Sequence, residues 1–214
     1  MPKMTYRDDP EKLRAKVLRL AQFPKGRRKQ SYQSYWLGDE YIAGSRDVLY
    51  RLEKLGLPKT LLESSVLDLG CNLGTVCVEC YNRGSREILG IDNDKDYLEC
   101  ARDLARYNGH QINFIQSDLK DSDKIVEYIK SYFSKPVDHV FALAMYKHIG
   151  NSLWDILDGI NFRTVYLESS GCKDITTPHV VEVDKQLKER YEVEFLGFTE
   201  DRSKRAIWRA TNGT

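Results

Sequence analysis

Short apolar runs alternate with longer amphipathic stretches through most of this chain, from residue 66 onward. The apolar runs have the length of β-strands, and each following stretch has the spacing of a helix that buries one face. The predicted strands are residues 66–70, 87–92, 112–117, 137–144 and 163–169. The predicted helices are residues 74–83, 94–108, 121–134, 151–160 and 178–190. This alternation favours a parallel sheet with helices on both faces.

The end of the chain breaks the alternation. Two further strand-like runs, residues 191–198 and 205–210, are joined by the six residues TEDRSK. Because six residues are too few for a helical crossover, we expect an antiparallel hairpin there. The sequence therefore predicts an α/β, Rossmann-like sheet of seven strands, parallel except for its terminal hairpin.

The first 60 residues precede this alternation and are read as a helical extension. Residues 10–21 have the spacing of a short amphipathic helix, and residues 39–56 look like a second helix ending at Gly56. We therefore expect an N-terminal extension or lid, residues 1–60, and a sheet domain, residues 61–214.

Positive charge is concentrated in the extension. Residues 1–60 hold 14 Lys and Arg against 7 Asp and Glu, whereas residues 61–214 hold 19 against 25. Within residues 24–36, PKGRRKQSYQSYW, four basic side chains precede three aromatic ones. That composition suits phosphate contacts and base stacking on RNA, and it equally suits a solvated basic face beside a lid. Both interpretations stay open.

Composition limits the class of protein. Hydrophobic residues make up 41% of the chain, enough for a substantial core. The sequence shows neither an apolar signal-peptide segment nor a membrane-spanning run, and its five cysteines are an odd number. We expect a soluble, cytoplasmic protein with reduced thiols. Cys77 and Cys80 form a CxxC pair inside a predicted helix, which we interpret as core packing because the rest of a zinc site is missing.

A glycine turn follows the first predicted strand in VLDLGCNLGT, residues 66–75. Because Gly70 and Gly74 have no Cβ, a ligand can approach the backbone closely there, and Asn72 between them tolerates positive φ. The string fits the dinucleotide fingerprint badly. In addition, Asp68 would repel a pyrophosphate and attract an ammonium group. The turn therefore indicates an amino acid joined to adenosine.

Two more carboxylates follow the next two predicted strands. Asp92 ends the second strand, where it can accept hydrogen bonds from ribose hydroxyls. Asp118 follows the third strand and suits an exocyclic adenine amine, with the Leu119 backbone beside it. Because parallel strands end at one edge, we expect Asp68, Asp92 and Asp118 to line one pocket.

Four strings carry a resemblance to a known family. VLDLGCNLG, ILGIDND, NFIQSDL and DHVFALAMYKHIG resemble the four motifs of class I S-adenosylmethionine-dependent methyltransferases. The likeness covers roughly residues 60–212 and implies the seven-stranded fold and S-adenosylmethionine as cofactor. It also implies cofactor contacts from Cys71, Asn93 and Ala144. Asn72 departs from the pattern, since glycine is commoner there.

Local likenesses bear on the acceptor. The Tyr and His after the fourth strand are similar to a pair in enzymes that modify wobble uridine in transfer RNA, although Lys147 intervenes here. DLGCNLG, with the Tyr/Arg-containing segment before it, resembles the RNA methylphosphate capping enzymes. Small-molecule methyltransferases, including ones that act on sugars, also carry such a string. The acceptor stays open between RNA and a small metabolite.

The acceptor side should follow the fourth strand, beside the transferred methyl. Tyr146, Lys147 and His148 stand there in a row. His148 could serve as general base, Tyr146 could orient the acceptor, and Lys147 could bind an anionic one. The alternative is that they cap the next helix or face solvent. Arg46 is expected to pair with the cofactor carboxylate or with an acceptor phosphate.

Other site types are less well supported. Glu168, His148 and His179 offer metal-binding side chains, but their spacing is not clustered, and we expect no metal. The sequence therefore predicts a methyltransferase that modifies an oxygen or nitrogen, with RNA as the favoured acceptor and a small metabolite as the alternative. A non-catalytic cofactor-binding partner protein is a third hypothesis. The sequence gives no oligomeric state.

Overall fold

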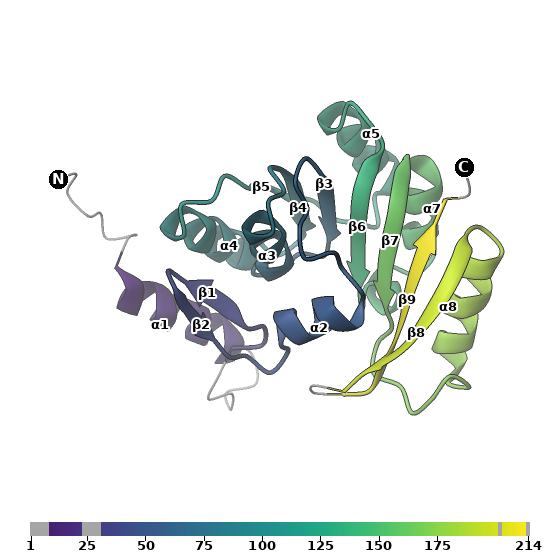
Figure 1. Ribbon diagram of the computed structural model, residues 1–214, viewed down its shortest axis with the longest axis horizontal. Coiled ribbons are helices and arrows are strands. Elements are labelled where there is room, and N and C mark those ends of the chain that lie inside the picture. Colours follow the sequence, from purple (N-terminus) through teal and green to yellow (C-terminus); the bar gives the residue numbers. More distant parts are fainter. Residues whose placement is uncertain (1–8, 23–30, 201–202, 213–214) are drawn as a thin grey trace.

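The computed structural model describes residues 9–22, 31–200 and 203–212, and a sheet of seven strands forms the centre of this part of the chain (Figure 1). The strand order is β5-β4-β3-β6-β7-β9-β8. Strands β3 to β7 run parallel, and β9 is antiparallel to both of its neighbours. The strands are β3 (Ser65–Leu69), β4 (Glu87–Asp92), β5 (Asn113–Gln116), β6 (Val137–Leu143), β7 (Phe162–Glu168), β8 (Glu192–Thr199) and β9 (Arg205–Thr211). The predicted fold, with its terminal hairpin, is confirmed.

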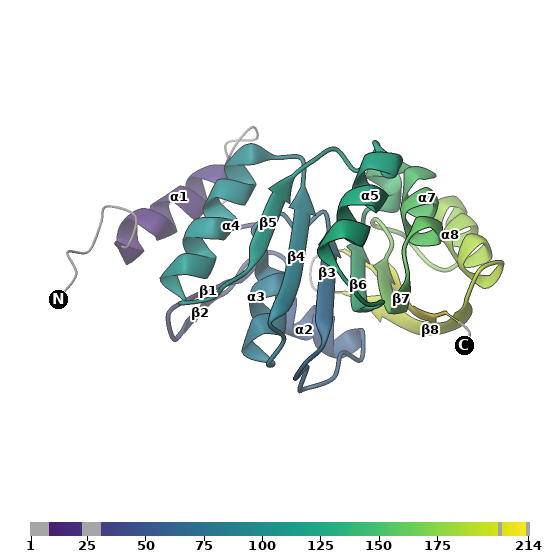
Figure 2. The same ribbon diagram turned by 90° about the horizontal axis from the view of Figure 1, so that it is seen from above.

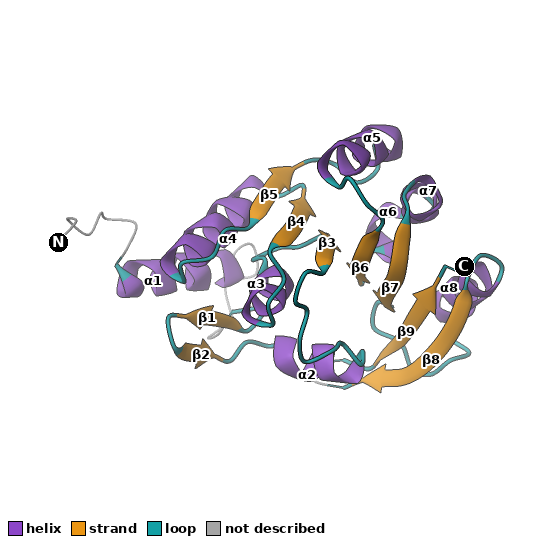
Figure 3. Ribbon diagram, turned by 45° about the horizontal axis from the view of Figure 1, so that its top comes forward, coloured by secondary structure: helices purple, strands orange, loops and turns teal. Residues whose placement is uncertain are grey.

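Helices cover both faces of the sheet, as Figure 3 shows. One face carries α5 (Ser122–Tyr132), α7 (Ser152–Gly159) and α8 (Pro178–Lys188). The other carries α2 (Val48–Lys54), α3 (Thr75–Asn82) and α4 (Lys95–Tyr107). In β3, Leu67 and Leu69 enter the first core and Val66 the second, because successive side chains of a strand point to opposite faces. Among the described residues, no helix is both long and apolar enough to cross a membrane.

The N-terminal segment departs from the prediction in one element. The helix expected over residues 39–56 is wrong: β1 (Tyr35–Leu37) and β2 (Glu40–Ile42) form a hairpin, and only α2 is helical. Strands of three residues are too short for their alternation to stand out against a helical pattern. The structure thus replaces one long helix by a small hairpin and a short helix.

Local contacts explain the hairpin. Gly38 sits in its two-residue turn with φ +63°, a conformation that glycine adopts without strain. Trp36 and Tyr41 face each other across the strands, with ring centroids 4.9 Å apart. The following helix begins at Asp47, whose Oδ1 accepts a hydrogen bond from the Tyr50 amide at 3.0 Å. The turn and the cap together fix where the chain leaves the hairpin and enters α2.

The predicted first helix is confirmed as α1 (Pro10–Gln22), which lies beside α4 (Figure 2). Leu13 and Val17 pack with residues of β1 and α4 in a third apolar cluster. Lys16 Nζ also pairs with Asp103 on α4 at 2.6 Å. The N-terminal segment is therefore packed on the sheet domain, while the division at residue 60 stays a prediction.

Candidate active site

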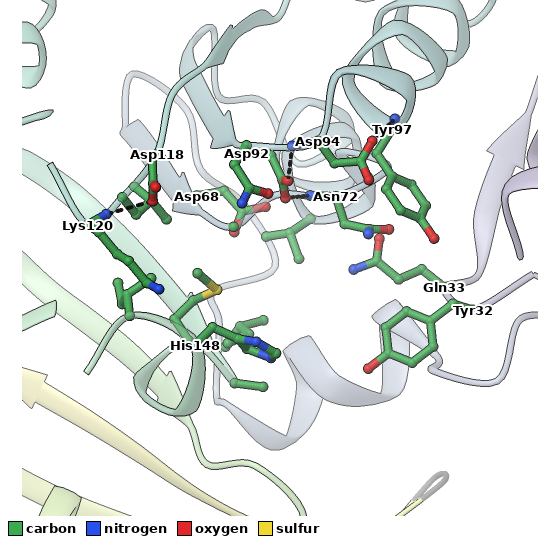
Figure 4. A pocket seen from close by; sticks show the side chains of 18 of the residues that line it. Tyr32, Gln33, Asp68, Asn72, Asp92, Asp94, Tyr97, Asp118, Lys120 and His148 are labelled. Carbon is green, nitrogen blue, oxygen red and sulfur yellow. Dashed lines mark hydrogen bonds between the residues drawn. The ribbon is translucent and has the colours of Figure 1, made fainter. Parts of the chain in front are cut away.

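A cavity of about 510 Å³ opens where the parallel strands end. It is lined by these residues that the sequence singled out: Asp68, Gly70, Asn72, Asp92, Asn93, Asp118, Leu119, Ala144 and His148. Figure 4 shows the aspartates of the strand ends along one side and His148 across from them. Cys71, Gly74, Arg46, Tyr146 and Lys147 lie outside the lining, so their expected roles stay predictions.

The glycine turn has the backbone conformation that the sequence requires. Gly70, Asn72 and Gly74 all have positive φ, at +77°, +52° and +67°. Asn72 therefore occupies the left-handed region in which asparagine is favoured over most residues. A Cβ at Gly74 would lie 2.5 Å from Cζ of Phe114, whereas one at Gly70 would meet the side chain of Met145. Gly74 thus serves packing behind the turn, and Gly70 faces the cavity wall.

Asp92 holds this turn in place. Its Oδ2 accepts a hydrogen bond from the Asn72 amide at 2.8 Å, and its Oδ1 accepts one from the Asp94 amide at 3.0 Å. Burial raises the pKa of Asp92, while these amides oppose the shift. Each carboxylate oxygen has a second lone pair, so the group can still accept hydrogen bonds from a diol.

Asp68 is the most buried of the three carboxylates, with 3% of its surface exposed. Burial raises the pKa of Asp68 to about 7, and the nearby Arg51 guanidinium and the Cys77 thiol oppose the shift. Cys77 Sγ lies 3.7 Å from Asp68 Oδ2. A cationic ligand beside the turn would therefore stabilise the ionised form of this buried carboxyl.

Asp118 completes the acidic side. It is exposed, and its Oδ1 accepts a hydrogen bond from the Lys120 amide at 3.0 Å. The neighbouring Leu119 is buried and lines the same cavity. Since β5, β4 and β3 are neighbours in the sheet, Asp118, Asp92 and Asp68 follow one another along its edge.

The segment after β6 forms the opposite side. Ala144 has φ +66°, a strained conformation for a residue with a Cβ, and its amide donates to the Glu168 carbonyl at 2.7 Å. The short helix α6 (Tyr146–Ile149) follows. It places His148 in the cavity lining, whereas Tyr146 packs toward Trp154 with ring centroids 5.7 Å apart. Lys147 is exposed.

Glu168, at the end of β7, is buried and forms ion pairs with three arginines. Arg46 and Arg51 both pair with it, the latter at 2.7 Å, and Arg205 pairs at 3.1 Å. Thr199 Oγ1 also donates to it at 2.8 Å. These cations lower the pKa of Glu168 although burial opposes the shift. Arg46, expected at the cofactor or acceptor, is 1% exposed and directed to Glu168.

Several lining residues escaped the sequence analysis. Arg51 and Arg205 line the cavity, as do Lys120, Gln33 and Tyr32, the first of the three aromatic residues in the 24–36 stretch. The sequence could have indicated Arg51, because a charged residue there interrupts the apolar face of α2. In the structure Arg51 is 5% exposed. The others have no local pattern that marks them.

The remaining cysteines and histidines fit structural roles. Cys77 and Cys80 are buried in the second core, and burial raises the pKa of both thiols. His179 Nε2 lies 3.3 Å from the Ser170 carbonyl oxygen. Within the described ranges, no three His, Cys, Asp or Glu side chains are grouped as metal ligands.

The donor set fits an aminoacyl adenosine. Asn72 Oδ1 is buried and has no hydrogen-bond partner among the described residues, although it belongs to a cavity-lining side chain. Such an orphaned acceptor is costly unless a ligand donates to it. Together with Asp68 it provides two acceptors for an ammonium group, while Asp92 and Asp118 provide acceptors for hydroxyl and amine donors.

Comparison with known proteins agrees with this geometry. Residues 66–160, from β3 to the end of α7, match the family model described as methyltransferase domain. A carboxy-S-adenosyl-L-methionine synthase of Wolinella succinogenes is 31% identical over 84 residues, which are 36% of this chain and 35% of that protein. The matches span between 26% and 35% of the length of the curated relatives.

Solved structures share the fold over a longer stretch. A crystal structure of WbdD aligns with a TM-score of 0.64 at 19% identity, covering 95% of this chain and 48% of WbdD. Magnesium protoporphyrin IX methyltransferase from Synechocystis PCC 6803 aligns with a TM-score of 0.57 at 15% identity, covering 76% of each chain. The family match thus covers the strands and turns that carry most of the site, and residues 66–160 are similar to a methyltransferase domain.

Proposed function

We propose that this protein transfers the methyl group of S-adenosylmethionine to an oxygen or nitrogen nucleophile. The observation that carries the proposal is the set of three carboxylates near the ends of β3, β4 and β5, which face one cavity. Beside them lies Asn72 Oδ1, a buried acceptor that has no partner within the described part of the chain. A pyrophosphate cofactor would meet repulsion there, whereas a cationic aminoacyl adenosine meets acceptors.

Each carboxylate has its own partner in this proposal. Asp68 and Asn72 hold the ammonium group, Asp92 accepts from the ribose hydroxyls, and Asp118 accepts from the adenine amine. The cofactor supplies a methyl group already activated by the sulfonium. The protein therefore has to orient the acceptor and exclude water more than it has to activate the donor.

His148 is the side chain that we assign to proton removal. It lines the cavity from α6, across from the aspartates (Figure 4). Imidazole accepts a proton near neutral pH, as a hydroxyl or protonated amine acceptor would require. Tyr32 and Gln33 line the same cavity from the N-terminal segment.

RNA is the acceptor that we favour, and its support is the basic run at residues 24–29. This run lies outside the described residues. Among the described basic side chains, Arg14 pairs with Glu40 and Lys16 with Asp103, while Arg46 and Arg51 are buried at Glu168. Arg14, Lys16, Arg46 and Arg51 thus already have acidic partners within the protein, and the 24–29 run is the RNA contact that we propose.

A small metabolite is the second candidate acceptor. Tyr32 and Gln33 come from a segment distant in sequence and line a cavity of about 510 Å³ together with the strand ends. A pocket of that size, bordered by an aromatic ring, suits a drug-sized molecule. This candidate predicts catalysis that does not depend on Arg27, Arg28 and Lys29.

Cofactor binding tests the reaction class. Calorimetric titration with S-adenosylhomocysteine should show binding to the wild type and a loss of about tenfold in affinity for Asp118→Asn, because the hydrogen bond from the adenine amine loses its charged acceptor. Asp121→Asn is the matched control, since Asp121 is exposed and lies outside the cavity lining. A wild-type protein that is indifferent to the ligand would refute the proposal.

Filter binding to RNA over a salt series tests the acceptor. Binding at low salt that weakens steeply with added salt, and that is lost in Arg27→Ala/Arg28→Ala/Lys29→Ala, is expected for an RNA acceptor. Absence of binding to total small RNA at low salt would reject RNA. Unchanged methyl transfer by the triple variant would assign a small metabolite instead.

A further inference from the structure

Positive charge gathers around Glu168, and two of the arginines there, Arg51 and Arg205, line the cavity. Glu168 is one carboxylate in contact with three guanidinium groups, those of Arg46, Arg51 and Arg205. Arginine stays protonated at all working pH values, so three positive charges meet at this one carboxylate. Asp68 is a second acid near these arginines, and it interacts electrostatically with the Arg51 guanidinium.

An excess of buried charge is costly unless a counter-ion completes it. Arg46 and Arg51 are 1% and 5% exposed, and Arg51 Nε is buried without a hydrogen-bond partner among the described residues. A ligand that brings negative charge to this cluster would remove part of the cost.

Arg205 directs this charge into the cavity. Its Nε donates to Ser203 Oγ at 3.3 Å, one terminal nitrogen donates to Glu168 at 3.1 Å, and the other donates to the Tyr32 hydroxyl at 3.2 Å. A guanidinium has five N–H donors, so one donor on each terminal nitrogen has no partner among the described residues. Paired donors of this kind match the two oxygens of a phosphate or carboxylate.

Strand order separates this arginine from the cofactor side. Asp118, Asp92 and Asp68 mark β5, β4 and β3, and Arg205 begins β9, which lies beyond β6 and β7 at the same edge. Three strand spacings of about 4.8 Å place the start of β9 about 14 Å from β3. His148, which follows β6, lies between them in chain topology. Arg205 therefore stands on the acceptor side of the proposed base.

We propose that Arg205, supported by Arg51, binds an oxyanion of the methyl acceptor, either a phosphate or a carboxylate. The proposal rests on the proposed function, because it names the chemistry of the acceptor for the same site. It excludes acceptors that are cationic near the nucleophile, since three guanidinium groups would repel them.

Inorganic phosphate is the probe for this subsite. Thermal unfolding of the protein saturated with S-adenosylhomocysteine should shift upward with phosphate, relative to chloride at equal ionic strength, because a ligand of the native state stabilises it. Arg205→Gln should lose this shift. Arg205→Lys keeps the positive charge but not the paired N–H donors of the guanidinium, so it should retain part of the shift. Glu168 keeps two cationic partners in both variants, so the fold should survive.

Arg209→Gln is the matched control. Arg209 lies on the same strand, pairs with Glu194 and is absent from the cavity lining, so this variant should keep the phosphate shift. Affinity for S-adenosylhomocysteine should stay within about twofold of wild type in Arg205→Gln, because Arg205 is assigned to the acceptor. Acetate replaces phosphate in a second arm, and a shift with acetate alone assigns a carboxylate acceptor.

Three results would overturn the proposal. They are the absence of any anion-dependent shift in wild type, a shift that survives in Arg205→Gln, and a tenfold loss of S-adenosylhomocysteine affinity in Arg205→Gln with unchanged affinity for 5′-methylthioadenosine. The last result would assign the guanidinium to the cofactor carboxylate, which methylthioadenosine lacks. Failure of the proposed function is separate, since it would appear as wild-type protein that does not bind S-adenosylhomocysteine at all.

Discussion

Burial destabilises the ionised form of Asp68, and our proposal assigns the same carboxylate to the cofactor ammonium, so Asp68→Asn separates the two effects. Burial raises the pKa of Asp68 from 3.8 to about 7, with Arg51 and Cys77 opposing. In the unfolded chain the same group titrates near 3.8. Because the folded pKa is the higher one, the folded state is favoured most when the carboxyl is protonated. Stability then falls as pH rises from about 4 to about 7.

The magnitude follows from the size of the shift. About three pKa units correspond to about 4 kcal/mol once the pH is above 7. Between pH 5 and pH 8 the expected loss from this one group is about 3 kcal/mol, since part of it is already lost at pH 5. Asparagine has the same shape and cannot ionise, so Asp68→Asn should not show this loss.

Urea unfolding of the ligand-free protein at pH 5 and pH 8 measures the effect. From the lower to the higher pH, Asp68→Asn should gain about 3 kcal/mol in the free energy of unfolding relative to wild type. At pH 8 the same variant should bind S-adenosylhomocysteine about 10- to 100-fold more weakly, because the ammonium loses a charged acceptor. Binding of 5′-methylthioadenosine, which has no ammonium, should change little.

Either of two results would contradict this reasoning. If wild type and Asp68→Asn show parallel pH dependence, the carboxyl is not the group that titrates in this window. If affinity for methylthioadenosine falls as much as affinity for S-adenosylhomocysteine, Asp68 does not act through the ammonium. Asp121→Asn, an exposed aspartate outside the cavity, controls for a general effect of removing a negative charge.

Further predictions concern the glycine turn, the Glu168 ion pairs and the proposed base His148. Gly74→Ala should lower the free energy of unfolding by about 1–3 kcal/mol, because its Cβ would lie 2.5 Å from the Phe114 ring at φ +67°; an unchanged urea midpoint would contradict the packing role. Glu168→Gln should destabilise the protein by about 3–5 kcal/mol by leaving three arginines without their carboxylate, and a melting temperature equal to wild type would exclude this. His148→Ala should lower kcat by about 100-fold with unchanged affinity for S-adenosylhomocysteine, whereas Lys147→Ala, which changes a side chain outside the cavity lining, should leave kcat near wild type. Equal losses in both variants would argue against His148 as the base.

The acidic side of the site could be predicted because it depends on local sequence. Asp68, Asp92 and Asp118 each stand at or just after the end of a predicted strand, and parallel topology brings such positions to one edge. The left-handed conformation of Asn72 was likewise readable from its place between two glycines. These features need the strand boundaries and the sheet class, both of which the alternation of runs supplies.

The N-terminal segment could not be predicted in the same way. The sequence of residues 39–56 has a helical pattern, but the structure has there the second strand of a hairpin followed by α2. The hairpin depends on the Gly38 turn and on the Trp36–Tyr41 pair, which outweigh intrinsic helix preference over this stretch. In α2, Arg51 interrupts an apolar face, and only the tertiary contact with Glu168 explains why it is tolerated there.

Glu168 shows why the acceptor side resists prediction from one sequence. Its arginine partners stand 122, 117 and 37 positions away along the chain, so no local motif announces their meeting. The same contacts tie α2 and the segment before it to the ends of β7 and β9, so the position of the N-terminal segment and the charge of the cavity are set together. The proposed cofactor side consists of short local motifs, whereas the opposite side is assembled from long-range ion pairs. Acceptor chemistry in such an enzyme must therefore be inferred from the tertiary placement of charge, which here favours an anion.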